Sequence, residues 1–303
     1  MTKPFRIVDA HHHLWDLSAR QRYPWLMEKG RVRFFGDPSP IQCDYLTEDF
    51  RKDIGELPVV ASIHIQVGVA PGDELAETYW LQEQHRQTGL PSAIIAYCDM
   101  TAPNLAAKLD AHQKALCLRG IRQIIGRSAE EDKRTGSALL LDNPNFLAGL
   151  KCLAERKLTF DLQLIPTQME RAAELLSQVP NLHVALCHAG SLNDPSPEGM
   201  AQWKQGVVQL SKLPNLICKL SGFGMFNKRW SSQSIKAQFE TVLDVFGPER
   251  IAFGSNFPVD KLALSYAEVW NRYFDLTKEL RSEALNSVFH DTAARFYRIA
   301  DSD

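Results

Sequence analysis

The stretch FRIVDAHHHLWD at residues 5–16 is an apolar run that ends in three consecutive histidines. Because side chains alternate between the two faces of a β-strand, we expect His11 and His13 on one face and His12 on the other. Two imidazoles on the same face can share one metal ion. Asp9 has the same parity as His11 and is expected one layer deeper, where it would hold a ligand or line the floor of a pocket. A purification tag is disfavoured, because a strand-like run precedes the histidines.

Seven further apolar runs follow, and helical patterns separate most of them. The eight runs span residues 5–11, 59–67, 92–98, 116–122, 158–164, 183–188, 216–221 and 250–255. Eight strands that alternate with helices indicate an α/β fold of the (β/α)8 TIM-barrel type, which commonly needs about 250 residues. We therefore expect residues 1–303 to form a single domain.

Several helices are recognisable from their acidic starts, amphipathic patterns or Gly and Pro stops. They are expected at residues 73–88, 104–113, 145–156, 168–177 and 234–246, with two extra C-terminal helices at 266–274 and 277–297. Residues 15–58, rich in Tyr, Trp, Pro and Gly, make a long first βα loop. In a barrel, such an insertion most often builds a wall or lid over the active site.

Composition excludes several function classes. The formal net charge is -2, from 34 basic and 36 acidic residues, so no overall charge draws the chain to nucleic acid or to an anionic membrane. There is no GxxxxGK[ST] loop, no GxGxxG after a strand and no GxSxG motif. The six cysteines form no CxxC pair, and no run approaches the ~18 apolar residues of a membrane helix. We expect a cytoplasmic protein with reduced cysteines, without a nucleic-acid or membrane partner; a homo-oligomer is left open.

Candidate site residues follow from the ends of the runs, because barrel active sites form at the carboxyl ends of the strands. These residues are His11, His13, His64, Gln66, Arg119, Arg122, Gln123, His188, Lys219, Ser221 and Asn256. Arg119 and Arg122 have opposite parity, so only one can point inward, and we favour Arg122 with Gln123 at the mouth.

A set of motifs spans nearly the whole chain in a fixed order. They are DAHHHLWD at 9–16, YPWL at 23–26, LRGIRQ at 118–123, FDLQLIPTQ at 160–168, CHAG at 187–190, CKLSG at 218–222, FGPERIAFGSNFPV at 246–259 and DTAARFY at 291–297. Together they resemble the amidohydrolase superfamily, and within it the amidohydrolase-related lactonases of sugar acids and of 2-pyrone-4,6-dicarboxylate. The resemblance implies a barrel of the metal-dependent-hydrolase type.

The resemblance also implies a site. His11, His13 and His188 would line one pocket and, in metal-using members, bind Zn²⁺ or another divalent metal ion. Three neutral imidazoles leave a position for water, whose pKa on zinc falls to about 7, and the ion would polarise a lactone carbonyl. A metal-independent site is also allowed, because some lactonases of this kind use no metal. For His188 alone, a satisfied core histidine is the competing interpretation.

Asn256 departs from the family pattern, which generally has an aspartate at this position that acts as the base. An amide has no accessible basic pKa, so Asn256 cannot be the general base. Four alternatives remain: another base, with His64, His188 and Asp260 as candidates; metal-bound hydroxide alone; a site without metal; or loss of hydrolysis. In our hypothesis Asn256 positions the water or a substrate oxygen by hydrogen bonding.

The polar rim predicts a small anionic substrate. The Arg122 fork matches a carboxylate, although a salt bridge to a neighbouring helix is the alternative. Lys219 and Ser221 share parity and would contact substrate oxygens, with Gln66 beside them; a deep lysine is also often a structural ion-pair partner. The aromatic residues Trp15, Tyr23, Trp25 and Trp230 would form an apolar wall or pack within loops. The predicted function is a lactonase for a small carboxylated or sugar-acid lactone, with a decarboxylase or hydratase, or a non-hydrolytic binding protein, as alternatives.

Overall fold

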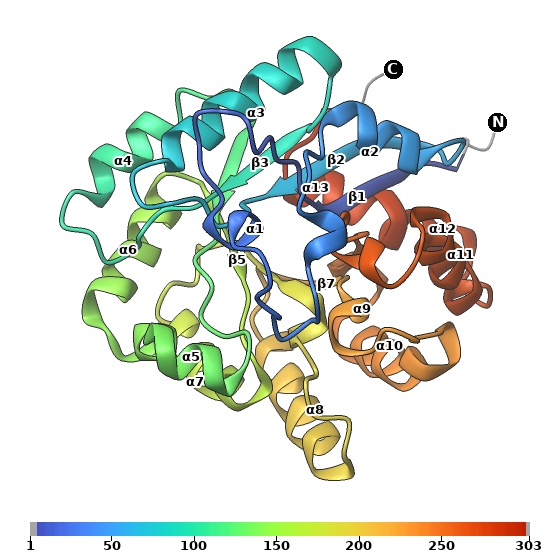
Figure 1. The fold of residues 1–303 in the computed structure, drawn as a ribbon. Coiled ribbons are helices and arrows are strands. Elements are labelled where there is room, and N and C mark those ends of the chain that lie inside the picture. Colours follow the sequence, from blue (N-terminus) through green and yellow to red (C-terminus); the bar gives the residue numbers. More distant parts are fainter. Residues whose placement is uncertain (1–4, 301–303) are drawn as a thin grey trace.

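The computed structural model describes residues 5–300, and a barrel of eight parallel strands forms its centre (Figure 1). The strands pair in sequence order from first to last. They are β1 (Ile7–His12), β2 (Val59–Ile65), β3 (Ala93–Ala96), β4 (Leu118–Ile121), β5 (Thr159–Leu162), β6 (Val184–Leu186), β7 (Leu216–Leu220) and β8 (Ile251–Phe253). The expected (β/α)8 fold is confirmed, and each strand lies within one residue of a predicted apolar run.

The ends of β1 and β8 are joined at the carboxyl-terminal rim. The Asn256 N–H donates to the His11 carbonyl at 2.6 Å, and the His13 N–H donates to the Phe257 carbonyl at 2.7 Å. These two bonds bring the histidines that follow β1 beside the residues that follow β8, although the two segments are far apart in sequence.

Helices surround the barrel (Figure 1). They are α1 (Pro24–Met27), α2 (Thr47–Ile54), α3 (Glu74–Thr88), α4 (Leu105–His112), α5 (Ala129–Thr135), α6 (Pro144–Glu155), α7 (Met169–Ser177), α8 (Pro197–Ser211), α9 (Phe223–Phe226), α10 (Ser232–Phe246), α11 (Tyr266–Thr277), α12 (Ser282–Asn286) and α13 (Thr292–Phe296). Short 3-10 turns lie at Ser39–Ile41, Ser137–Asp142, Pro166–Gln168, Cys187–Gly190, Pro248–Arg250 and Asp260–Leu262, and a π-helical turn lies at Ser287–Asp291. The long first connection carries α1 across the centre of the barrel in the view of Figure 1, as expected of a wall or lid.

Two helical expectations need correction. The helix predicted at 277–297 is interrupted, because α11 runs to Thr277 and the next helix begins only at Ser282, before a π-helical turn and α13. Helix α8 was not predicted, since its glycines weaken the helical signal. At Gly206 a Cβ atom would lie 2.5 Å from the Met169 sulfur, so α8 approaches α7 at a distance that excludes a side chain.

The parity expected for Asp9 is wrong, and a β-bulge is the reason. Asp9 pairs with Ser62 and His12 with His64, so three steps along β1 oppose two steps along β2. The extra residue reverses the alternation. Asp9 is fully buried on the outer side of the barrel, where its carboxylate accepts hydrogen bonds from the Ser255 N–H at 2.9 Å and the Tyr266 hydroxyl at 3.0 Å. It supports the strand ends and does not line the pocket.

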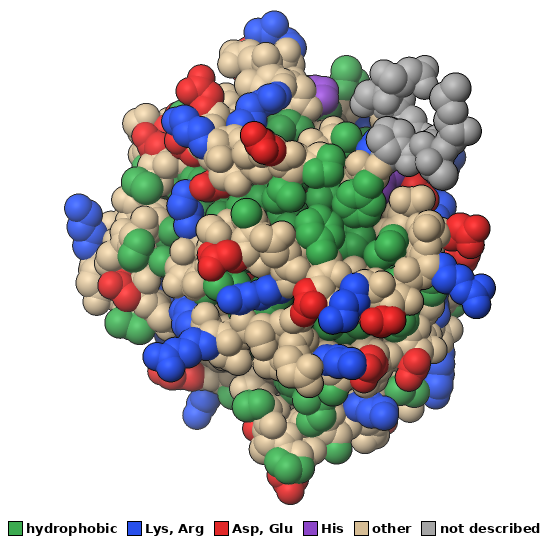
Figure 2. All heavy atoms as spheres, turned by 90° about the vertical axis from the view of Figure 1, so that its right-hand side faces the viewer, with side chains coloured by type: hydrophobic (Ala, Val, Ile, Leu, Met, Phe, Trp, Pro, Cys, Tyr) green, Lys and Arg blue, Asp and Glu red, His purple; other side chains and the backbone are tan. Residues whose placement is uncertain are grey.

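On the face of the molecule shown in Figure 2, acidic and basic side chains are intermixed around a hydrophobic area. No helix within residues 5–300 is long and apolar enough to cross a membrane.

Candidate active site

A cavity of about 860 Å³, counted to its open mouth, lies at the carboxyl-terminal end of the barrel. Its walls come from the long first connection and from the segments that follow β1, β2, β4, β5, β6, β7 and β8. The lining residues are His13, Trp25, Arg33, Phe34, Phe35, Val67, Gly68, Arg122, Ile124, Arg127, Glu131, Arg134, Gln163, His188, Met225, Asn256 and Val259. Four of the residues predicted from the sequence, His13, Arg122, His188 and Asn256, therefore share one cavity.

The three predicted metal-binding histidines lie together. The ring centre of His11 is 4.5 Å from that of His188 and 5.2 Å from that of His13. His13 Nδ1 donates to the Ile65 carbonyl at 2.7 Å. In a neutral imidazole the other nitrogen, Nε2, then carries no proton and keeps a free lone pair. His188 Nδ1 is held by the Ser221 hydroxyl at 3.0 Å. Both ring nitrogens of His11 are buried and have no hydrogen-bond partner.

These histidines are neutral at physiological pH. Burial and, to a smaller extent, the charge of Arg122 lower the pKa of His13 to about 3. Burial, followed by the charge of Lys219, lowers the pKa of His11 well below its usual value. Burial and the charge of Arg122 do the same to His188. A neutral imidazole keeps the lone pair that a metal ligand needs.

Asn256 presents an oxygen to His13. Its Nδ2 donates to Asp260 Oδ1 at 2.8 Å, and this bond fixes the orientation of the amide. Asn256 Oδ1 then lies 3.3 Å from His13 Nε2, so two lone pairs face each other. Such a contact needs a proton or a cation to be favourable. Burial raises the pKa of Asp260 to about 7, and the carboxyl also accepts from the Gly224 N–H at 3.2 Å.

The donor set fits a divalent cation, with three neutral imidazoles and one amide oxygen. The unpaired nitrogens of His11 and the opposed lone pairs of His13 and Asn256 are the observations that favour it. Within residues 5–300, no three His, Cys, Asp or Glu side chains converge closely enough to hold a metal. Binding would therefore require small rotations of these rings, which His11 can make without breaking a hydrogen bond.

Two features of the backbone shape this end of the barrel. His188 and Asn256 have φ angles of 55° and 56°, in the left-handed region that non-glycine residues occupy mainly at constrained or functional positions. A Cβ atom at Gly222 would lie 2.4 Å from His188 Nδ1, and one at Gly254 would lie 2.6 Å from the His11 Cβ. Only glycine at these two positions lets the histidine rings take their places.

Arg122 is a buried cation without a carboxylate partner in the described part of the chain. It is 5% exposed; its Nη1 donates to Gln163 Oε1 at 2.8 Å and its Nη2 to the Gln66 carbonyl. Its Nε has no partner. Burial lowers its pKa to about 10, so the guanidinium remains charged at neutral pH. The alternative of a salt bridge to a neighbouring helix is wrong, and the free charge favours an anionic ligand.

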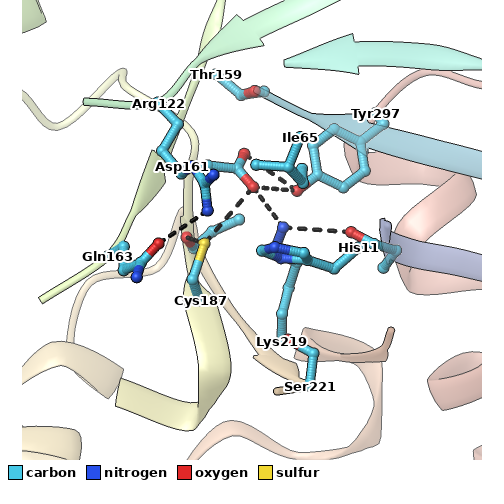
Figure 3. A network of polar contacts seen from close by, with 12 residues as sticks. His11, Ile65, Arg122, Thr159, Asp161, Gln163, Cys187, Lys219, Ser221 and Tyr297 are labelled. Carbon is cyan, nitrogen blue, oxygen red and sulfur yellow. Dashed lines mark hydrogen bonds and ion pairs between the residues drawn. The ribbon is translucent and has the colours of Figure 1, made fainter. Parts of the chain in front are cut away.

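Lys219 does not reach the cavity. It is fully buried, where it forms an ion pair with Asp161 and donates to the Ala10 carbonyl at 3.2 Å (Figure 3). The Tyr297 hydroxyl and the Cys187 thiol contact the same carboxylate. The structural ion pair, offered as the alternative for this lysine, is the arrangement found, and a direct contact between Lys219 and substrate is not supported.

Other predicted substrate contacts also lie outside the cavity lining. Ser221 is occupied with His188. Gln66 contributes its backbone carbonyl to Arg122, and its buried side-chain Oε1 has no partner. Trp15 is fully buried behind Trp25, 6.0 Å between ring centres, and donates to the Cys43 carbonyl. Of the four aromatic residues proposed for the wall, only Trp25 lines the cavity.

His64 lies behind the cavity wall and cannot act as its base. Its Nδ1 accepts from the Leu14 N–H at 3.1 Å, and its Nε2 faces Glu77 at 4.0 Å. His12, whose side chain was expected to turn away from the pocket, stacks on Phe50 at 4.1 Å between ring centres. His64 and His12 therefore belong to the layer between strands and helices.

Sequence reasoning missed much of the mouth of the cavity. The missed residues are Arg33, Phe34, Phe35, Val67, Gly68, Ile124, Arg127, Glu131, Arg134, Gln163, Met225 and Val259. Most lie in connections, where no periodic pattern says which side chain turns inward. Arg33, followed by Phe34 and Phe35, could have been noticed as an arginine next to two aromatics inside the expected lid.

Glu77 makes stability depend on pH. It is 1% exposed, and burial raises its pKa from 4.5 to about 8. A carboxyl whose folded pKa lies above its unfolded pKa stabilises the fold fully below pH 4.5, and this contribution is lost as the pH rises through 8. The buried histidines act in the opposite direction but only below their unfolded pKa of about 6.5.

We therefore expect the free energy of unfolding to fall between pH 6.5 and 8, at a rate of at most about 1.4 kcal/mol per pH unit from this one group. Glu77→Gln keeps the acceptor for the Val67 N–H, 3.2 Å away, and should make the decline shallower. Urea denaturation across this range measures the slope. Glu83→Gln is the control, because Glu83 lies at the surface, where it pairs with Arg86. Equal slopes in the wild type and the Glu77 variant would contradict the assignment.

The chain is similar to known proteins over nearly its whole length. The sequence pattern of the amidohydrolase family matches residues 8–299. The chain belongs to the amidohydrolase family. It is 37% identical to an uncharacterized protein, y4mH, of Sinorhizobium fredii, over 97% of this chain and 98% of that protein. It is 27% identical to an L-fucono-1,5-lactonase of Burkholderia multivorans, over 97% and 96% of the two chains. The predictions of the family and of a hydrolase are confirmed.

A solved amidohydrolase structure is also similar to this chain. An amidohydrolase of Burkholderia multivorans with bound zinc superimposes with a TM-score of 0.82 at 25% identity, covering 98% of this chain and all of that one. Decarboxylases of the same fold are only 13–14% identical, so their likeness concerns the fold alone.

Proposed function

We propose that this amidohydrolase is a zinc-dependent lactonase that opens a small lactone bearing a carboxylate. The observation that carries the proposal is the Arg122 guanidinium, which has no carboxylate partner among the described residues, in one cavity with His13, His188 and the Asn256 amide oxygen. The buried ring of His11 lies beside both cavity histidines. The lactonases among the relatives and the zinc in a similar structure support it. His11, His13 and His188 would hold the ion, which when bound supplies a Lewis acid and lowers the pKa of water.

The remaining chemistry belongs to side chains of this chain. Arg122 binds the substrate carboxylate and sets the position of the ring. Asn256 Oδ1 has two lone pairs, so it can face the ion with one and accept a hydrogen bond from water with the other, while Asp260 holds the amide NH2 group. Trp25, Phe34 and Phe35 limit access of bulk water to the reacting carbonyl. Hydrolysis then adds the water oxygen to that carbonyl carbon and breaks the ring C–O bond, and the proton lost by the water goes to the ring oxygen, which is released as a hydroxyl.

The direct test is a panel of cyclic carboxylates assayed both for ring opening, by release of acid, and for release of CO₂. Ring opening that requires Arg122 supports the proposal. Release of CO₂ without ring opening would support a decarboxylase. Tight binding without turnover would support a non-hydrolytic descendant.

The pair formed by Asn256 and Asp260 provides a sharper test. In the wild type the Asn256 amide donates to the Asp260 carboxylate at 2.8 Å. Asn256→Asp would replace this donor with a second carboxylate, and two carboxylates this close cannot both be ionised. We expect kcat to fall at least about tenfold. The double variant Asn256→Asp with Asp260→Asn restores one amide and one carboxylate and should recover part of the loss. A single Asn256→Asp change that creates ring opening absent from the native chain would instead favour the binding protein.

A further inference from the structure

The chain makes a left-handed turn directly after β6. Four consecutive residues, His188, Ala189, Gly190 and Ser191, have φ angles of 55°, 49°, 75° and 53°. In this conformation the Cβ atom of an L-residue crowds the following carbonyl oxygen, so such residues normally occur singly and are mostly glycine. Three of these four residues carry a Cβ atom. Strain that is repeated over neighbouring residues persists only where the surrounding structure imposes it.

Helix α8 supplies a contact that imposes this conformation on the 188–191 turn. The indole Nε1 of Trp203 donates to the Ala189 carbonyl at 2.7 Å, in the middle of the turn. Trp203 is fully buried, so bulk water cannot readily take over this hydrogen bond. The turn also closes on itself, because the Ser191 N–H donates to the His188 carbonyl at 2.8 Å. The indole therefore ties a strained backbone segment to a regular helix.

Close packing holds the 188–191 turn from a second side. Met169, the first residue of α7, lies between Gly190 of the turn and Gly206 of α8. A Cβ atom at Gly190 would overlap Met169 Cε, and one at Gly206 would lie 2.5 Å from the Met169 sulfur. Gly206 follows Trp203 by about one helical turn, so the two residues are on the same side of α8. The turn and the two helices therefore pack as one unit around Met169.

The 188–191 turn decides where the His188 ring lies. This ring lines the cavity, with its centre 4.5 Å from that of His11, and its Nδ1 is held by the Ser221 hydroxyl at 3.0 Å. The hydroxyl fixes the rotation of the ring, whereas the backbone angles of His188 fix the direction of its Cα–Cβ bond. A right-handed or extended backbone at this residue would point that bond elsewhere. Support of the turn is therefore support of a candidate metal ligand.

We propose that Trp203 is a positioning residue, which clamps the 188–191 turn from outside the barrel and so holds His188 in the orientation that binds a divalent cation. Trp203 is not among the residues that line the cavity, and it acts through the backbone carbonyl of Ala189. The assignment of His188 as a zinc ligand rests on the proposed function, whereas the clamp itself does not.

Two conservative variants separate the hydrogen bond from packing. Trp203→Phe removes the indole N–H and keeps an aromatic ring. Trp230→Phe is the matched control, because Trp230 is equally buried but its indole N–H has no hydrogen-bond partner among the described residues. Thermal unfolding of both variants shows that each is folded and how much stability the smaller ring costs.

The first measurement is hydrogen exchange of the full chain after chelation of metal. We expect the amides of residues 189–191 to exchange at least about tenfold faster in Trp203→Phe than in the wild type, because a buried carbonyl loses its donor. The second measurement is calorimetric titration with zinc. We expect the affinity of Trp203→Phe to fall at least about tenfold, as is typical when a group that orients a metal ligand is removed. Trp230→Phe should match the wild type in both.

Ser191→Gly offers a rescue that packing alone would not give. The buried Ser191 hydroxyl has no partner among the described residues, and glycine adopts a φ of 53° without the steric cost. In the double variant Trp203→Phe with Ser191→Gly, we therefore expect both the slow exchange and the zinc affinity to recover in part. Recovery of neither would show that Trp203 only fills space, and would overturn the proposal.

The remaining outcomes are also decisive. Unchanged exchange of residues 189–191 in Trp203→Phe, or equal losses in Trp230→Phe, would overturn the clamp. A wild-type chain that binds no zinc would refute the zinc-dependent lactonase, and hydrogen exchange would still decide whether Trp203 holds the 188–191 turn.

Discussion

Replacing His13 by alanine is expected to abolish ring opening and to remove bound zinc. The Nε2 lone pair of His13 faces Asn256 Oδ1 at 3.3 Å, so this ring is the donor closest to the fourth candidate ligand. Its loss would leave two imidazoles and an amide oxygen, a weak set for zinc. A Lewis acid contributes several kcal/mol to the transition state, which corresponds to a fall in kcat of about 1,000-fold.

Metal content and activity should be measured on the same preparations. Chelation of the wild type should lower activity by a similar factor, and adding zinc back should restore it. His183→Ala is the matched control, because His183 is exposed and lies outside the cavity. A His13→Ala protein that retains full activity, or a wild type that is fully active after complete removal of metal, would take the ion out of the mechanism.

The fold was predictable from the sequence because strands of a closed parallel barrel are covered on both sides and appear as separate apolar runs. The end of a run then marks the rim, and this argument brought His13, Arg122, His188 and Asn256 into one cavity. The argument succeeded because each of these four residues ends a predicted run or lies within two residues of its end, on strands that share one direction.

Other parts of the site could not be predicted, for identifiable physical reasons. The parity of Asp9 was wrong because a bulge in β1 adds one residue, and no local composition marks a bulge. His64 follows the parity of its strand but faces α3, since the interior positions of β2 belong to Ile63 and Ile65. The arginines at the mouth of the cavity come from irregular connections, whose side-chain directions depend on the tertiary fold.

The barrel interior offers the prediction with the largest effect on stability. Lys219 and Asp161 are both 0% exposed and form an ion pair next to the Ala10 carbonyl, one residue before His11, with Tyr297 and Cys187 around the carboxylate (Figure 3). Removing one partner leaves an uncompensated buried charge. We therefore expect Lys219→Met to lower the free energy of unfolding by about 3–5 kcal/mol.

The double variant Lys219→Met with Asp161→Leu distinguishes charge from packing. Two apolar residues of similar volume remove both buried charges, and such replacements of ion pairs are often neutral or stabilising. We expect urea denaturation to show that the double variant is more stable than Lys219→Met alone, with a coupling energy well above that of an exposed pair such as Lys278 and Asp275. If the losses of unfolding free energy in Lys219→Met and Asp161→Leu simply add in the double variant, the two charges do not stabilise each other. The place of the pair beside the Ala10 carbonyl would then reflect filling of the barrel interior rather than the effect of the Lys219 charge, which lowers the pKa of His11.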